Sequence, residues 1–147
     1  MPQESSSIAE ALHEWMRGCP LLKKGARVGM DYLPETVTEY AVYATPSMIR
    51  YRENVLGEEI PEAVQTQNFV FASKEPFGAD IGQNLANQAF YEAVTLWIQE
   101  KNAKRQFPAI PGGVVKSIAP TLTAMIAEAG SDAARYQIQM KLTYRRA

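Results

Sequence analysis

One long segment, residues 80–105, most constrains the fold of this chain, because its sequence is typical of a single amphipathic helix. Asp80 is a helix-capping residue, and Gln83 stands where a capping box places its second member. Pro108 prevents the helix from continuing. At about 1.5 Å per residue such a helix spans roughly 35–40 Å, so the rest of the chain must supply a long apolar surface for it. Its apolar residues recur in two adjacent stripes: Ile81, Leu85, Ala89, Ala93 and Leu96, and beside them Ala86, Phe90, Val94 and Trp97.

Residues 135–145 form the clearest candidate for that surface, because apolar and polar residues alternate there without interruption. This pattern predicts an antiparallel strand with one buried and one exposed face. We expect the buried face, together with Phe69 and Phe71, to form the floor under the long helix. The apolar set is Tyr136, Ile138, Met140, Leu142 and Tyr144.

Two segments in the first half of the chain also favour strands. Residues 27–33 alternate, and residues 36–45 are rich in β-branched and aromatic side chains. Because only a short turn at residues 34–35 joins them, we expect an antiparallel hairpin. Residues 46–64 are predicted to be an irregular connection. A connection of this length is often functional, and an arm that contacts a neighbouring subunit is the alternative interpretation.

Two further strands are expected around the long helix. Residues 65–73 carry apolar side chains on both faces, which predicts a central strand. Residues 114–129 are strand-like but contain Pro120, which predicts an edge position, a bulge or two shorter strands. A turn is expected at residues 130–132.

A short helix is expected at residues 7–17, because Ser7 and Glu10 make a capping-box pattern ahead of an apolar stripe. His13 lies off that stripe and is predicted to be a solvated surface residue. The resulting order of elements predicts one α+β domain over residues 1–147. Its antiparallel or mixed sheet carries one long and one short helix packed on one face.

The chemistry-bearing residues do not form a catalytic pattern. His13 and Cys19 are the only histidine and the only cysteine, which excludes sites that need several such ligands. No nucleophile elbow, dinucleotide-binding, zinc-protease or calcium-loop motif occurs. Carboxylates are plentiful, but no pair is marked out as an acid and base. We therefore expect no enzyme activity, no catalytic residue, no cofactor and no metal.

The same sequence gives expectations about location. No apolar run approaches the roughly 20 residues of a membrane span, so no membrane partner is expected. The first residues lack the basic start and apolar centre of a secretory signal. A single cysteine allows no intramolecular disulfide, which fits a reducing compartment.

Charge is distributed unevenly along the chain. Residues 1–100 hold 7 Lys and Arg against 14 Asp and Glu, whereas residues 101–147 hold 8 against 2. One interpretation is two differently charged surfaces without a purpose. The other is head-to-tail association, in which an acidic face of one copy meets a basic face of the next.

Two stretches resemble a known family. Residues 68–75, NFVFASKE, which follow Tyr51 and Gly57, resemble one of its signatures, and residues 134–144, ARYQIQMKLTY, resemble its closing strand. The helix ending near Trp97, with Pro108 beyond it, lies between them in the expected order. The family comprises small phage and prophage minor capsid proteins of Gram-positive bacteria, which are similar to siphophage tail terminators. The resemblance covers about residues 5–146.

This resemblance implies a virion structural protein assembled in the cytoplasm of a bacterial host. Its expected form is a homo-oligomeric ring, a hexamer on the tail tube, which joins the tail to the head. Its expected partners are other copies, the tail tube protein and a head-completion or neck protein. The family also includes neck proteins other than terminators, so the station in the virion stays open.

The residues that contact these partners are expected in the acidic connection, in the C-terminal strand, or in both. The candidates are Arg50, Arg52, Glu53, Glu58, Glu59, Glu62, Lys141, Arg145 and Arg146. Two other functions stay open: a nucleic-acid-binding accessory protein, favoured by the basic residues of 101–147, and a small ligand-binding or enzymatic domain. No basic cluster interleaved with aromatic residues supports specific nucleic-acid binding.

Overall fold

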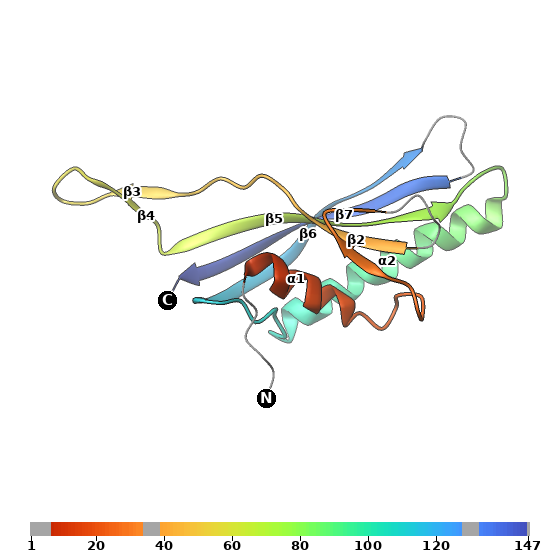
Figure 1. Ribbon diagram of the computed structural model, residues 1–147, viewed down its shortest axis with the longest axis horizontal. Coiled ribbons are helices and arrows are strands. Elements are labelled where there is room, and N and C mark those ends of the chain that lie inside the picture. The colour runs from red at the N-terminus through yellow and green to blue at the C-terminus, as the bar shows by residue number, and fades with distance from the viewer. Residues whose placement is uncertain (1–6, 34–38, 128–132, 147) are drawn as a thin grey trace.

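A mixed sheet of five strands forms the centre of the computed structural model, which describes residues 7–33, 39–127 and 133–146, with residues 124–127 described by their backbone alone. The strands lie side by side in the order β1-β2-β5-β7-β6 (Figure 1). Their bounds are β1 Val28–Met30, β2 Glu39–Ala44, β5 Val64–Pro76, β7 Ala133–Arg146 and β6 Gly113–Ala127. With two helices on one face, this confirms the α+β fold class expected from the sequence.

β5 is the central strand, as its apolar residues on both faces predict. It pairs antiparallel with β2 on one side and with β7 on the other. The β7 ladder runs the whole length of β5, from Val64 opposite Arg145 to Pro76 opposite Ala133. Every residue from 69 to 75 is buried, so this half of β5 is the most enclosed part of the sheet.

The helices α1 (Ile8–Arg17) and α2 (Ile81–Ala103) cover the same face of the sheet (Figure 1). They meet through Trp15 and Trp97, whose ring centroids lie 4.8 Å apart. The predicted alternation of β7 is confirmed, because its apolar set packs into the core beneath α2 while its polar residues lie on the other face. One core therefore joins both helices to the sheet.

Both helices begin at the residues that the sequence marks. The Ser7 side chain accepts a hydrogen bond from the Glu10 amide at 3.0 Å, and Asp80 accepts from the amides of Gly82 and Gln83. The capping-box role predicted for Gln83 is wrong, because its side chain donates to Asn87 within the helix instead. The Asp80 carboxylate alone supplies the cap of α2.

The face that α2 buries differs from the first predicted stripe. Ile81, Leu85 and Leu96 of that stripe are 74%, 63% and 64% exposed. The buried residues are Asn87, Tyr91, Val94 and Ile98, at spacings of four, three and four. Val94 of the second stripe is buried, and Phe90 and Trp97 are half-buried against the core. The helix is thus rotated toward a face that contains two polar residues.

Those polar residues find partners inside the core. The Tyr91 hydroxyl hydrogen-bonds Ser73 and donates to the Tyr136 carbonyl at 3.1 Å. Asn87 donates to the Pro76 carbonyl at 2.7 Å and lies 3.4 Å from the Tyr136 hydroxyl. Burial raises the pKa of Tyr91 far above its ordinary value. The hydroxyl therefore stays neutral, and its hydrogen bonds fix α2 against β5 and β7.

The pairing of β1 with β2 is parallel, so the predicted antiparallel hairpin is wrong. β1 ends at Met30, and the next residue, Asp31, has a φ of 56° and turns the chain away. The Asp31 amide donates to the Val42 carbonyl, and the Asp31 carboxylate accepts from the Ala44 amide at 3.1 Å. These bonds hold the end of β1 beside the end of β2. The turns predicted at residues 34–35 and 130–132 lie outside the described residues.

β6 lies at the edge of the sheet and is irregular, as Pro120 predicts. Its register against β7 shifts between Val115 and Ser117 and again between Pro120 and Leu122. Proline and bulges interrupt the row of free backbone groups that an edge strand offers to other chains. This edge is therefore a poor template for continuing the sheet into a second molecule.

The first prediction concerns which side chains of β7 point into the core. Ile138 is completely buried between the helices and the sheet, whereas Gln139 points to the other face and is half-buried. Ile138→Asp places an unpaired charge in the core and should cost more than about 4 kcal/mol of the free energy of unfolding. Thermal melting followed by circular dichroism should show no cooperative native transition.

Gln139→Glu is the matched control, because it adds the same charge one residue away. Its melting temperature should stay within a few degrees of the unchanged protein. A native-like melt for Ile138→Asp would mean that β7 faces the other way.

Candidate interaction surface

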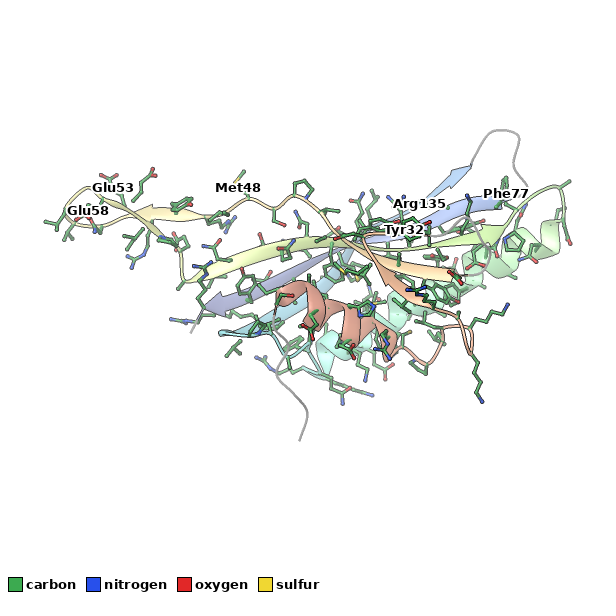
Figure 2. The ribbon with its side chains drawn as sticks, in the orientation of Figure 1. Tyr32, Met48, Glu53, Glu58, Phe77 and Arg135 are labelled. Carbon is green, nitrogen blue, oxygen red and sulfur yellow. The ribbon has the colours of Figure 1, made fainter. Side chains whose placement is uncertain are left out.

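A hairpin arm, residues 46–63, projects from the end of the sheet where β5 begins (Figure 1). Within it β3 (Tyr51–Glu53) and β4 (Glu59–Pro61) pair antiparallel as a separate two-stranded sheet. The predicted irregular connection is therefore wrong for this segment, because it contains a regular hairpin. Figure 2 shows Met48 along the arm and Glu53 and Glu58 near its tip. Isolated two-stranded hairpins are at best marginally stable in water, so the arm gains from a partner.

The tip of the arm is a turn built by one asparagine and one glycine. The Asn54 side-chain oxygen accepts from the amides of Leu56 and Glu58, both at 2.9 Å. Gly57 has a φ of 80°, which side chains disfavour, and its amide donates to the Asn54 carbonyl. The turn is thereby specified without any contact to the main body, and it holds Val55 and Leu56 at the outermost point.

The root of the arm is held by Gln65, a buried side chain on β5. Its oxygen accepts from the Arg50 amide at 3.0 Å, and its nitrogen donates to the carbonyls of Arg50 and Glu62, both at 2.9 Å. The Glu62 amide also donates to the Arg50 carbonyl. Gln65 therefore joins both strands of the arm to the sheet. The sequence offers no signal for this role, because a glutamine in a strand is normally read as solvated.

Large apolar side chains are exposed along the arm. Val55 and Leu56 at the tip are 103% and 79% exposed. Several exposed apolar side chains on one projecting element indicate a surface that binds another molecule. The others on the arm are Met48, Ile49 and Tyr51.

Carboxylates surround that apolar tip. Glu53 lies directly opposite Glu59 in the β3–β4 pair, and Glu58 lies in the turn between them. Like charges at opposed positions destabilise a hairpin. No lysine or arginine stands among residues 53–59. The tip thus combines apolar and acidic character, and a cationic partner would relieve its internal repulsion.

The structure brings together most of the residues predicted for the interface. Six of the candidates lie on the arm: Arg50, Arg52, Glu53, Glu58, Glu59 and Glu62. Arg145 and Arg146 end β7 beside the arm root, where the Arg146 amide donates to the Ala63 carbonyl and Arg145 lies opposite Val64. Lys141 is exposed further along β7, opposite Asn68. Acidic and basic candidates therefore share one end of the molecule instead of forming separate faces.

A second basic group, which sequence reasoning missed, lies at the other side of the molecule. A cavity of about 720 Å³ opens between the end of α1, the segment after it and β1. Arg17, Lys23, Lys24 and Arg27 line it, together with the half-buried apolar residues Leu22, Ala26, Val28 and Met30. The signal was present in residues 17–27, which contain four cations and no carboxylate. We call this site the cationic cavity.

His13 and Cys19, the other residues with reactive side chains, are packed against the rest of the structure. His13 is half-buried and its Nε2 lies 2.7 Å from the Val28 carbonyl, so the prediction of a solvated histidine is wrong. Cys19 is buried, and burial raises the pKa of its thiol, which disfavours the reactive thiolate. Among the described residues no group of three or more His, Cys, Asp or Glu side chains is placed to hold a metal ion.

Comparison with models of known protein families finds no match for this chain, and a search of curated proteins finds no relative. Of the helices in the described part of the chain, neither α1 nor α2 combines the length and the apolar character that crossing a membrane requires. The candidate surface therefore rests on geometry and charge.

The role of Gln65 gives the second prediction. Gln65→Leu keeps the volume of the side chain but removes three hydrogen bonds to the arm root, each worth about 1 kcal/mol. Hydrogen exchange at the amides of Arg50 and Glu62 should become at least about tenfold faster. Amides in the middle of β7 should keep their protection, because the core is unchanged.

Gln137→Leu is the control, since it makes the same change on a neighbouring strand far from the arm. It should leave exchange in the arm unaltered. Unchanged exchange at Arg50 and Glu62 in Gln65→Leu would show that the arm is held by other contacts.

Proposed function

We propose that this protein is a virion structural subunit, a phage tail terminator or neck component that assembles into a homo-oligomeric ring and joins the tail tube to the head. The observation that carries the proposal is the projecting arm with its exposed apolar and acidic tip. Exposed apolar side chains on a projecting element are typical of a surface that binds another protein. The resemblance of residues 68–75 and 134–144 to minor capsid proteins of Gram-positive phages supplies the biological setting.

The architecture suits a ring subunit mechanically. The long central strand, bonded to both neighbours and covered by α2, makes a stiff body, and the arm extends that body at one end. Two different surfaces on one chain lead to head-to-tail contacts, which close into a ring when the rotation between subunits permits. The irregular edge strand β6 opposes the alternative, which is open-ended continuation of the sheet.

The partners proposed are other copies of this chain, the tail tube protein and a head-completion or neck protein. The exposed stripe of Ile81, Leu85 and Leu96 on α2 offers a further apolar contact for one of them. In this role the protein holds neighbours in register and performs no reaction. It needs neither cofactor nor metal.

Self-association is the third prediction. Light scattering coupled to size-exclusion chromatography, at concentrations from about 1 µM to 1 mM, should show a concentration-dependent shift from a 16.3 kDa monomer to a closed oligomer. Negative-stain electron microscopy of the oligomer should show rings. A monomer of unchanged mass over the whole range would contradict self-assembly.

A further inference from the structure

We propose that the tip of the arm of one copy docks in the cationic cavity of a second copy. This inference rests on the proposed self-association and names the two surfaces that would form the contact. The arm contributes Val55 and Leu56 with three surrounding carboxylates. The cavity contributes four cations, together with the half-buried apolar side chains Leu22, Ala26, Val28 and Met30.

The charges of the two surfaces are complementary. Glu53, Glu58 and Glu59 give the tip three negative charges without a cation among residues 53–59. Among the residues that the structure describes, no carboxylate lines the cavity. Of its cations only Arg17 has an ion pair within the described residues, with Glu14 at 2.9 Å, whereas Lys23, Lys24 and Arg27 have none. Opposite potentials of this kind steer association and fix the register of an interface.

The shapes are compatible as well. The tip is narrow, because a turn of one asparagine and one glycine closes it, and its two apolar side chains are almost fully exposed. A cavity of about 720 Å³ has room for two such side chains and part of the turn. Burying Val55 and Leu56 in the cavity would stabilise the contact through the hydrophobic effect. The carboxylates around the tip would then lie against Lys23, Lys24 and Arg27 at the rim.

An arm cannot reach the cavity of its own chain. Val28, which lines the cavity, lies beside Tyr40, and Tyr40 lies beside Ser73. Val64 is the first residue of β5, where the arm joins the sheet, and Ser73 lies nine residues further along this strand. At roughly 3.3 Å per residue, the two positions are about 30 Å apart. The arm extends away from that point, as Figure 1 shows. The occupant must therefore come from another molecule, and the contact is head-to-tail.

A second hollow, whose lining is more apolar, suits the arm less well. It lies between α2 and β6, where Gln88, Glu92 and Leu96 are among its lining residues. Glu92 would face the carboxylates of the tip there, and none of the described residues that line this hollow is a cation. Charge thus favours the cationic cavity over the α2–β6 hollow.

Paired charge reversal tests the proposal. In the arm variant, Glu58→Lys and Glu59→Lys make the tip basic. In the cavity variant, Lys23→Glu, Lys24→Glu and Arg27→Glu leave Arg17 as the one cation against three carboxylates, so the charge of the cavity is reversed. All five side chains are exposed, so both variants should melt like the unchanged protein. Each variant alone should self-associate at least tenfold more weakly in sedimentation velocity, because like charges meet at every contact.

An equimolar mixture of the two variants should assemble again. The basic arm then fits the reversed cavity, and the acidic arm fits the original one, so every contact joins two different variants. Native mass spectrometry should show oligomers with equal numbers of both. The control Lys104→Glu with Lys116→Glu reverses two exposed charges that belong neither to the arm nor to the cavity lining, and it should leave the affinity of association within threefold of the unchanged protein.

Several results would overturn the docking while leaving self-association intact. These are unaltered assembly of the arm variant, failure of the mixture to assemble, or a loss in the control as large as that in the cavity variant. If the cavity variant keeps its assembly but loses salt-dependent binding to a short DNA duplex, the cavity holds nucleic acid and the proposal is wrong. An unchanged protein that stays monomeric would contradict both the docking and the proposed function.

Discussion

The whole structure depends on one constraint: the sheet has two faces, and in the described part of the chain the helices cover only one of them. The β5–β7 ladder satisfies this constraint residue by residue. Phe69 opposite Met140 and Phe71 opposite Ile138 point toward the helices. Between them, Val70 lies opposite Gln139 on the uncovered face. Alternation of this kind gives a sheet that packs on one side and meets water on the other.

On the uncovered face, long polar side chains cover small apolar ones. Ala41 and Ala72 are fully buried although no helix covers them. The Arg135 guanidinium lies 4.8 Å from the centre of the Tyr43 ring, so its stem and head cover the sheet while remaining partly solvated. Such a face needs no third layer, and it leaves the arm as the most conspicuous apolar surface of the molecule.

The elements of the body could be predicted because their signals are local. Alternation identified β7, the two-sided apolar pattern identified β5, and Pro120 identified the irregular edge. The orientation of α2 could not be predicted, since hydrophobic periodicity assumes that polar residues face water. Here Asn87 and Tyr91 are buried because Ser73, Pro76 and Tyr136 supply hydrogen-bond partners, and those partners come from distant strands.

The direction of strand pairing and the candidate interaction surface were also hard to predict from the sequence, for a similar reason. The direction of β1 against β2 was inferred from the length of their connection, but the two strands pair parallel, and the chain turns at Asp31 directly after β1. The charged candidates of the arm were found from composition, whereas Gln65 and the cationic cavity were not. Gln65 acts through backbone groups that only the fold brings within reach. The cavity arises because the basic segment between α1 and β1 folds beside half-buried apolar residues such as Leu22 and Val28.

The two halves of β5 therefore have different roles. The second half of β5 is enclosed by the core, while its first half carries the clamp that holds the arm. Exposed valine and leucine at the tip leave apolar surface in water until a partner covers it, and opposed carboxylates weaken the isolated hairpin. Docking with a site that is cationic and carries apolar side chains, as proposed, would remove both costs. Because the arm is held at its root, it would lose little conformational entropy on binding. Its exposed apolar side chains and its opposed carboxylates would supply favourable binding free energy.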